Sequence, residues 1–241
     1  MIGTRIREFL ARIPLVRRQL KSRWKRNVRQ RIATSADAKE AFTLIYKTNY
    51  WGNGESASGN GSSLASTETL RHELAGLLQR LSIRSMLDAP CGDFNWMQTV
   101  PFADGFHYIG GDIVDDIVAR CRATYGAPRR EFIVLDLTRG QHPQTDLWFC
   151  RDGLIHLSNA DIISALTCFV ASGAKYCLLT QYNSVPENVD IATGLTRHVN
   201  LLLPPFRLPP PRMQLQDRPV GEAARELGLW TRADIAQAIG V

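Results

Sequence analysis

The sequence predicts an α/β fold with a mostly parallel sheet and helices on both of its faces. Short apolar runs in residues 83–182 repeatedly end on an acidic residue, and segments with helical spacing separate them. Asp88, Asp112 and Asp136 follow one another at intervals that fit one strand, one helix and the return. The carboxyl ends of such parallel strands form the edge of the sheet that faces a ligand, so we expect these acids to meet there.

Five strands can be read in order along this region. They are IRSMLD (83–88), HYIGGD (107–112), EFIVLD (131–136), DLWFCRD (146–152) and AKYCLLTQY (174–182). Helical spacing of apolar residues predicts helices within 64–82, 113–123 and 159–171. A seven-stranded sheet would need two further strands, for which LGLW (227–230) is one candidate.

Residues 1–35 read as a basic amphipathic arm. Apolar residues recur every three or four positions and predict a helix that is kinked or split at Pro14. Residues 1–31 carry a net charge of +10, whereas the whole chain carries +6, so the remainder carries −4. The overall basic charge therefore belongs to the arm, and it does not make the globular part a nucleic-acid binder.

The arm is compatible with three partners. Its apolar stripe beside many cations is what a helix at the surface of an anionic membrane needs, and we rank peripheral membrane contact through residues 1–31 first. The stripe could instead dock on the protein's own sheet. The cations could bind nucleic acid, which we rank lower.

Residues 36–82 are expected to form an N-terminal cap, with a substrate loop ahead of the helix in 64–82. The segment YWGNGESASGNGSS (50–63) is rich in Gly, Ser and Asn and is predicted to be a loop. Its aromatic faces, hydroxyls and carboxylate suit a polar ligand such as a sugar, and a disordered linker is the alternative. The candidate substrate-binding residues are Tyr50, Trp51, Glu55 and Ser56.

The stretch MLDAPCGDFNW (86–96) carries the main indication of function. An apolar strand that ends in Asp88 and continues into a turn with Gly92 lets the backbone approach a bound molecule closely. Asp112, at the end of the next strand, is placed to accept hydrogen bonds from two ribose hydroxyls. The turn lacks the Gly-x-Gly-x-x-Gly of a pyrophosphate site, and Asp88 suits a cationic amine. An amine and a ribose together point to S-adenosylmethionine.

At this point the chain resembles the class I S-adenosylmethionine-dependent methyltransferases. The matching segments are MLDAPCGDF, GGDI (110–113), LDL (135–137) and CRDGLIHL (150–157), with CGDFNW in place of the usual Gly-x-Gly. The resemblance covers about residues 83–182 and implies a Rossmann-like methyltransferase fold with a mostly parallel seven-stranded sheet. The residues expected to bind the cofactor are Asp88, Ala89, Pro90, Cys91, Gly92, Asp112, Ile113, Asp136, Leu137 and Arg151.

Two residues at the fourth strand end are the candidate catalytic groups. A sulfonium methyl group is already activated, so a base is needed only when the acceptor is a hydroxyl that must lose its proton. His156 and Asp152 could take that role, although His156 could equally be a packed core residue. No cysteine or histidine spacing indicates a metal, and Cys91 is expected to serve packing or backbone contact.

The core is expected to span 83–241, with a proline-rich insert at 183–218. The prolines of LLLPPFRLPPP (201–211) favour an extended cover on the acceptor side over a helix. The five cysteines form no Cys-x-x-Cys pair, and no signal peptide or apolar span is visible. We therefore expect a cytoplasmic protein with reduced thiols, and the arm is the part that would attach it to the inner membrane face.

The predicted activity is therefore methyl transfer from S-adenosylmethionine, with O-methylation of a small polar or glycan-type acceptor favoured. Methylation of RNA or protein is the first alternative, and the basic arm is its only support in the sequence. A catalytically idle nucleoside-binding or scaffold protein is the second alternative.

Overall fold

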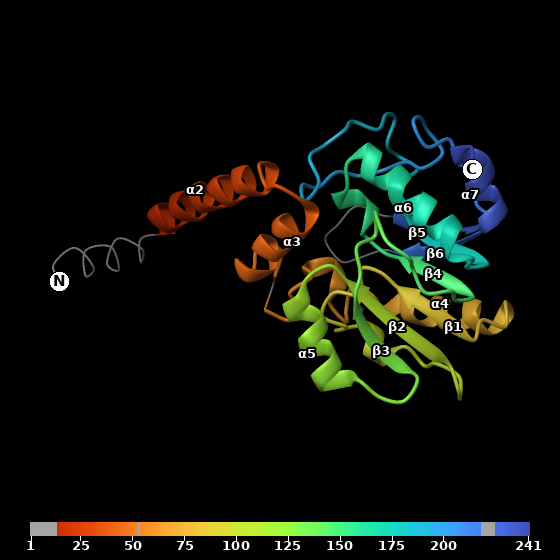
Figure 1. Ribbon diagram of the computed structural model, residues 1–241. Helices are drawn as coiled ribbons and strands as arrows, with labels where there is room; N and C mark the ends of the chain where they lie inside the picture. Colours follow the sequence, from red (N-terminus) through yellow and green to blue (C-terminus); the bar gives the residue numbers. More distant parts are fainter. Residues whose placement is uncertain (1–13, 53, 218–224) are drawn as a thin grey trace.

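A computed structural model describes residues 14–52, 54–217 and 225–241 of the chain. Its centre is a seven-stranded sheet in the order β3-β2-β1-β4-β5-β7-β6 (Figure 1). The strands are β1 (Ser85–Asp88), β2 (His107–Asp112), β3 (Arg130–Val134), β4 (Leu147–Cys150), β5 (Tyr176–Gln181), β6 (Met213–Asp217) and β7 (Arg225–Thr231). The predicted α/β fold with a mostly parallel seven-stranded sheet is confirmed.

The first five strands are parallel, and the last two are not. β7 pairs antiparallel with β5, and β6 pairs antiparallel with β7 at the edge of the sheet. The segment LGLW (227–230) lies in β7, as its apolar character predicted. β6 lies inside the segment 183–218 that we expected to be an insert, so the extended cover ends before Met213 and the sheet resumes there.

Two strands end earlier than the sequence predicted. β3 ends at Val134 and not at Asp136, and β4 ends at Cys150 and not at Asp152. After β3 the N–H of Leu135 still donates to the carbonyl of Asp112, so the chain leaves the sheet at Asp136. Asp136 caps a turn there, because its Oδ1 accepts a hydrogen bond from the backbone of Thr138 at 2.9 Å.

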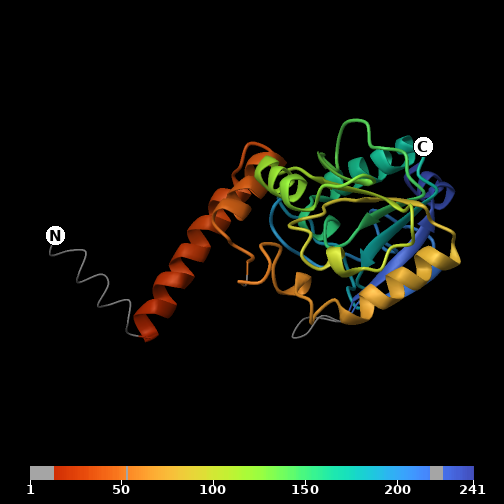
Figure 2. The ribbon, with the colours of Figure 1, turned by 90° about the horizontal axis from the view of Figure 1, so that it is seen from below.

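Helices cover both faces of the sheet (Figure 2). On one face, α4 (Glu68–Arg80) and α5 (Asp115–Tyr125) share a buried apolar cluster with β1 and β2. On the other face, α6 (Asn159–Ser172) and α7 (Arg232–Ile239) share a second cluster with β4 and β5. Three short 3-10 turns complete the core: η1 (Asn60–Ser62), η2 (Met97–Thr99) and η3 (Leu154–His156).

Two helices precede this core. α2 is described over Pro14–Ala33. Residues 1–13 lie outside the described part, and the kink or split expected at Pro14 therefore stays a prediction. Asp37 is the N-cap of α3 (Ala38–Lys47), and its side chain accepts a hydrogen bond from the backbone N–H of Glu40 at 2.8 Å. The end of α2 packs on α3 and not on the sheet, through Val28 and Ile32.

Residues 183–212 run over the carboxyl ends of β5 and η3 without forming a helix, as their prolines predicted. The buried side chain of Gln181 holds this cover, because its amide donates to Asn200 at 2.7 Å and its Oε1 accepts from the N–H of Leu201 at 2.8 Å. Arg197 donates to the carbonyl of Leu157. None of the described helices is long and apolar enough to cross a membrane.

Candidate functional site

A pocket opens at the carboxyl ends of β1, β2, β3 and β4. All four predicted acids line it: Asp88, Asp112, Asp136 and Asp152. Its cavity volume is about 140 Å³ when the open solvent at the mouth is left out.

The turn after β1 brings backbone to the floor of the pocket. Gly92 adopts a φ of 54°, in the left-handed region that side chains disfavour. A Cβ added there would lie 2.3 Å from Oγ of Ser58, so no larger residue fits without a shift of the loop. The buried ring of Phe94 fastens the turn to the core. Gly92 therefore lets Ser58 of the loop approach the turn closely, and its predicted approach to a bound molecule stays a prediction.

Asp112 stands at the end of β2 and is held by two backbone groups. Its Oδ2 accepts from the N–H of Gly92 at 3.2 Å, and its Oδ1 accepts from the N–H of Val114 at 3.0 Å. Burial raises the pKa of this carboxyl to about 6, although the backbone hydrogen bonds oppose the rise. The contact with Gly92 fixes the carboxylate against the turn after β1.

Asp88, at the end of β1, is the more strongly perturbed acid. Its Oδ2 accepts a hydrogen bond of 2.5 Å from the hydroxyl of the buried Tyr108. Burial raises the pKa of Asp88 to about 7, partly offset by that hydrogen bond. Two desolvated carboxylates in one pocket favour a ligand that brings hydroxyl donors and positive charge, and they disfavour an anion.

The side chain of Asp136 is occupied within its own turn. Its Oδ1 also accepts from the hydroxyl of Thr138 at 2.7 Å, and its Oδ2 forms an ion pair with Arg139 at 2.9 Å. The carboxylate of Asp136 therefore caps its own turn. Leu137 lines the pocket beside it, together with Leu135 and Ile113. The third strand end thus offers the pocket an apolar wall.

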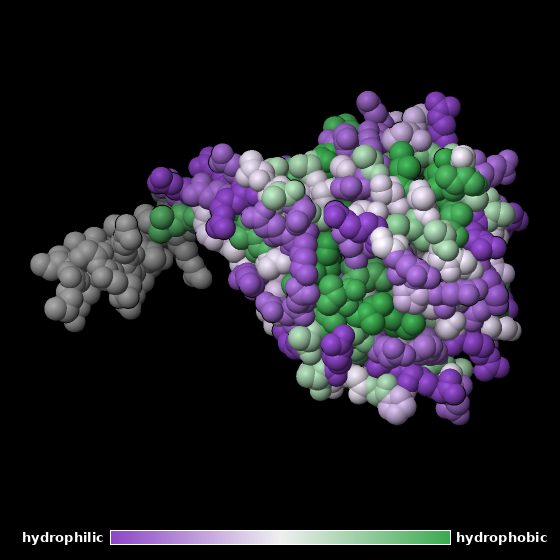
Figure 3. Space-filling view, in the orientation of Figure 1, coloured by the Kyte–Doolittle hydropathy of each residue, from purple (hydrophilic) through white to green (hydrophobic). Residues whose placement is uncertain are grey.

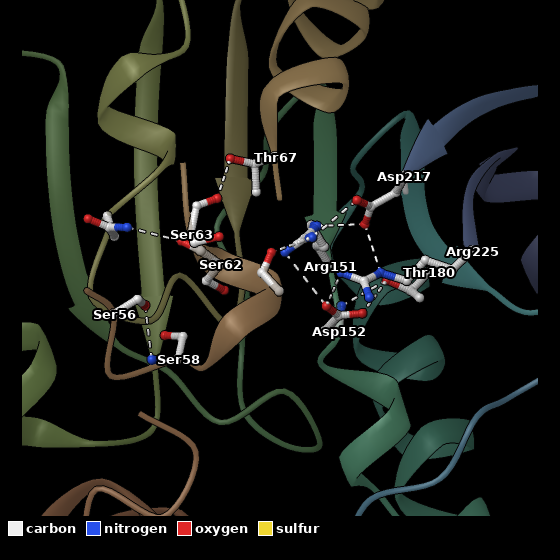
Figure 4. A network of polar contacts seen from close by, with 12 residues as sticks. Ser56, Ser58, Ser62, Ser63, Thr67, Arg151, Asp152, Thr180, Asp217 and Arg225 are labelled. Atoms are coloured by element: carbon white, nitrogen blue, oxygen red, sulfur yellow. Dashed lines mark hydrogen bonds and ion pairs between the residues drawn. The ribbon is translucent and has the colours of Figure 1, made fainter. Parts of the chain in front are cut away.

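A buried network of charges borders the pocket on the side of β4 (Figure 4). Arg151 donates to Asp217 through Nε at 2.8 Å and to the carbonyl of Gly61 at 2.8 Å. Arg225 donates to Asp217 at 2.8 Å and pairs with Asp152 at 2.9 Å. Each carboxylate therefore balances a guanidinium, and the network joins the rim of the pocket to the β6–β7 hairpin.

Two members of this network, Asp217 and Arg225, were missed in the sequence. They lie far from the motif segments along the chain, and only the fold brings them to Asp152. The charged residues at the start of β7, in RELGLWT (225–231), gave no functional signal. Asp152 itself sits in the left-handed region at φ 56°, and its backbone N–H donates to the hydroxyl of Thr180 at 2.8 Å.

His156 lies in η3 at the wall of the pocket. Its Nδ1 lies 3.0 Å from both the carbonyl oxygen of Leu195 and the hydroxyl of Thr196. The carbonyl can only accept whereas the hydroxyl can accept or donate, so the tautomer with the proton on Nδ1 satisfies both contacts. Burial lowers the pKa of His156 to about 4, so the ring is neutral at pH 7. Its Nε2 is consequently a lone-pair acceptor. The ring stacks on Trp51 with a centroid separation of 4.2 Å.

The four predicted substrate residues are placed differently from one another. Trp51 lines the pocket, whereas Tyr50 packs against Trp24 of α2. Oε1 of Glu55 accepts from the N–H of Leu64 at 2.7 Å, and the hydroxyl of Ser56 donates to Asp93 at 3.0 Å. The side-chain amide of Asn95 also donates to Oε1 of Glu55 at 3.0 Å, so Glu55 and Ser56 both hold the loop onto the turn after β1. Their role as substrate ligands stays a prediction.

Other residues of the same loop face the pocket. They are Ala57, Ser58 and Ser62, and the sequence did not distinguish them from their neighbours. Asp93 fixes this part of the loop, because its second carboxylate oxygen accepts from the N–H of Ala57 at 2.7 Å. Asp93, the acidic residue next to Gly92, is the signal that could have pointed to these loop residues, because it does not end a strand.

Comparison with known proteins adds the fold relationship. No protein-family model and no curated protein sequence matches the chain. Among solved structures, the N-methyltransferase NodS from Bradyrhizobium japonicum, in complex with S-adenosyl-L-homocysteine, has a TM-score of 0.55 at 12% identity, covering 78% of this chain and 97% of that one.

Two further structures agree with it. The magnesium protoporphyrin IX methyltransferase ChlM from Synechocystis PCC 6803 has a TM-score of 0.52 at 14% identity, covering 85% of this chain and 98% of that one. The methyltransferase domain of a bacterial Hen1 (CtHen1) has a TM-score of 0.52 at 11% identity, covering 69% of this chain and 99% of that one. The chain thus has the fold of the class I S-adenosylmethionine-dependent methyltransferases.

Proposed function

We propose that the protein is a methyltransferase that uses S-adenosylmethionine. The observation that carries this proposal is the pair of buried carboxylates, Asp88 and Asp112, that flank the glycine turn in one pocket. The fold supports it, because NodS and ChlM, which share the fold, were crystallised with S-adenosylhomocysteine bound.

The residues present fit the cofactor group by group. Asp112 would accept hydrogen bonds from the ribose hydroxyls, since it lines the pocket and backbone N–H groups fix the position of both its oxygens. Asp88 would pair with the ammonium group, and a cation there would offset the burial that raises its pKa to about 7. Ile113 and Leu137 would contact the adenine. Ala89, Pro90, Cys91, Gly92, Asp136 and Arg151 would form the remaining surface of the site.

A pyrophosphate cofactor fits less well. The turn after β1 contains Gly92 as its one glycine, and the cavity presents carboxylates where a phosphate would need donors. An anion placed between Asp88 and Asp112 would be repelled by both. The sulfonium of S-adenosylmethionine carries a methyl group that is already activated for transfer, so the protein's main task is to position an acceptor.

His156 is proposed as the group that takes a proton from a hydroxyl acceptor. Its neutral ring is held by Leu195 and Trp51 with Nε2 as the lone-pair site, which is the form a general base requires. Asp152 is proposed to position the rim, because Arg225 and Thr180 already engage it. A base at this wall favours O-methylation, and the hydroxyls of Ser58 and Ser62 suit a small polar or glycan-type acceptor.

The domain division and location are proposed on the same basis. Residues 1–35 would be an arm, 36–82 a cap that includes the loop over the pocket, and 83–241 the core. All five cysteines are free, which supports a reducing, cytoplasmic location.

There are two competing hypotheses, a methyltransferase that acts on RNA or protein and an idle nucleoside-binding protein. Transfer of isotopically labelled methyl groups in a cell extract, read by mass spectrometry, would identify the acceptor and exclude an idle protein.

The assignment of Asp112 is tested by calorimetry with S-adenosylmethionine. Asp112→Ala removes charge-assisted hydrogen bonds worth roughly 1.5–3 kcal/mol each, so affinity should fall by about tenfold or more. Asp104→Ala, at an exposed position in the loop before β2, is the matched control and should bind normally. Normal affinity in a folded Asp112→Ala protein would refute the ribose assignment.

A further inference from the structure

α2 stands clear of the body of the protein and is attached by one end (Figures 1 and 2). Val28 and Ile32 are 4% and 1% exposed and pack against Ala41 and Ile45 of α3. The packing is tight, because a Cβ added at Gly194 would lie 2.7 Å from Ile32. The end of the apolar stripe is therefore used for docking, which fixes the direction in which the rest of the helix projects.

The projecting part of α2 leaves apolar side chains exposed. Leu20 is 51% exposed and Trp24 is 39% exposed, and they lie one helical turn apart on one face. Upstream in the sequence, Ile13 and Val16 continue the same spacing. The ring of Trp24 also packs against Tyr50, yet Leu20 and Trp24 both keep exposed apolar area on a helix that projects from the body.

Cations surround these apolar side chains. The described part of α2 carries no acidic residue, and its exposed cations are Arg18, Lys21, Arg23, Lys25, Arg26, Arg29 and Arg31. Among the described residues, no ion pair engages any of them; Lys25 lies 5.6 Å above the ring of Tyr50. The helix surface is accordingly hydrophilic in Figure 3. Its charge fits a surface that is densely negative.

We propose that α2 is an attachment surface for an anionic lipid bilayer. This density of cations could bind either an anionic bilayer or a nucleic acid. Binding to nucleic-acid phosphates does not require the exposed apolar side chains of Leu20 and Trp24, whereas binding to a bilayer does. At a bilayer the apolar side chains enter the acyl boundary, Trp24 suits the headgroup level, and the cations meet anionic headgroups. The inference does not depend on methyl transfer.

The attachment would also place the pocket near the bilayer. α3 contacts α2 through Ala41 and Ile45, and its Phe42 and Tyr46 line the pocket. One short helix thus connects the exposed surface of α2 to the wall of the site. An acceptor held at a membrane would meet the pocket without leaving the surface.

The test is sedimentation of the full-length protein with phosphatidylcholine vesicles that do or do not contain phosphatidylglycerol. We expect binding to the anionic vesicles alone, reversed by high salt. Replacing Lys21, Lys25 and Arg26 by Gln should weaken it by about tenfold or more, since each cation near such a surface contributes about 1 kcal/mol. The matched control replaces three exposed cations of the body, Arg80, Arg84 and Arg232, and should bind as the wild type does.

Leu20→Asn separates the bilayer from a generic polyanion. It should weaken vesicle binding severalfold while the affinity for an unstructured RNA, measured by gel shift, stays unchanged. Cofactor binding of each variant by calorimetry reports folding independently, so a failed methyltransferase assignment and a failed attachment surface give different results. A protein that ignores anionic vesicles at low salt overturns the proposal, and so does RNA binding that the triple variant abolishes while vesicles go unbound.

Discussion

Replacing Asp88 by Asn should stabilise the ligand-free protein at pH 8. The pKa of Asp88 is raised from its ordinary value of 3.8 to about 7 by burial. Each tenfold change in acidity corresponds to about 1.4 kcal/mol, so keeping this side chain ionised in the fold costs roughly 4 kcal/mol. Asn resembles the protonated acid, is uncharged at every pH, and can still accept the hydrogen bond from Tyr108.

The pH dependence gives the sign of the effect. Below pH 3.8 the acid is protonated in both the folded and the unfolded chain, so no cost arises. Between pH 3.8 and about 7 the unfolded chain loses the proton and the folded chain keeps it, so the stability of the wild type falls as the pH rises. The gain from Asp88→Asn should therefore be roughly 4 kcal/mol at pH 8 and only about 1–2 kcal/mol at pH 5.

Urea unfolding followed by circular dichroism measures this difference at the two pH values. Titrating groups that are not coupled to Asp88, such as His156, are common to both proteins and cancel in the comparison. The charge of Asp112 contributes to the raised pKa of Asp88 and is therefore part of the measured effect. Asp104→Asn, at an exposed site, is the matched control and should change stability by less than about 0.5 kcal/mol. A destabilised Asp88→Asn protein at pH 8, or a gain that is equal at both pH values, would show that burial does not control this carboxyl.

The remaining predictions concern the wall, the turn and the charge network. His156→Asn should lower turnover by roughly a hundredfold with little change in cofactor affinity by calorimetry; a lower melting temperature with normal turnover would indicate a packing role instead. Gly92→Ala should weaken cofactor binding and lower stability, and adding Ser58→Ala should recover part of the loss, because the contact at 2.3 Å is with Oγ of Ser58. Asp217→Asn should cost roughly 3–5 kcal/mol in urea unfolding because two buried guanidiniums lose a partner, whereas Asp116→Asn, in an exposed pair with Lys47, should cost less than about 1 kcal/mol.

The order of strands and helices was predictable because local patterns determine it. Apolar runs such as HYIGGD, which is β2 from His107 to Asp112, alternate with helical spacing, and a parallel sheet follows from that alternation. The ends of the strands were less predictable. Residue types alone do not show whether the β-ladder includes residues 135–136 after β3 or residues 151–152 after β4. Hydrogen bonding by Asp136 to its own turn decided the matter there.

The acids of the site were predictable, and their partners were not. Asp88 and Asp112 end strands, and the topology of a parallel sheet places such residues together. Asp217 and Arg225 meet Asp152 only because β6 and β7 add antiparallel strands beyond β5. Pairing at that distance along the chain leaves no local signal. The pH properties of Asp88 were equally hidden, because desolvation depends on the complete surroundings.

Loop residues show the same limit in another form. Composition predicted that residues 50–63 cover a polar ligand, but it could not tell side chains that face the pocket from those that hold the loop. Ser56 and Ser58 differ by two positions; the first donates to Asp93, and the second lies over Gly92. The turn after β1 therefore selects which hydroxyls remain for a ligand, and that selection needs the folded contact.

The free-energy cost of ionising the buried Asp88 links the stability of the protein to the kind of ligand that it favours. Keeping Asp88 ionised destabilises the ligand-free fold by roughly 4 kcal/mol. A bound cation reduces this destabilisation, and the reduction adds to the binding free energy of the cation. A neutral nucleoside can use Asp112 through its ribose but has no charge to offer Asp88. A cationic nucleoside gains from both acids, and its advantage over the neutral one is greatest above pH 7, where Asp88 is ionised before the ligand binds. The two carboxylates together thus favour one class of adenosine ligand, and neither alone would do so.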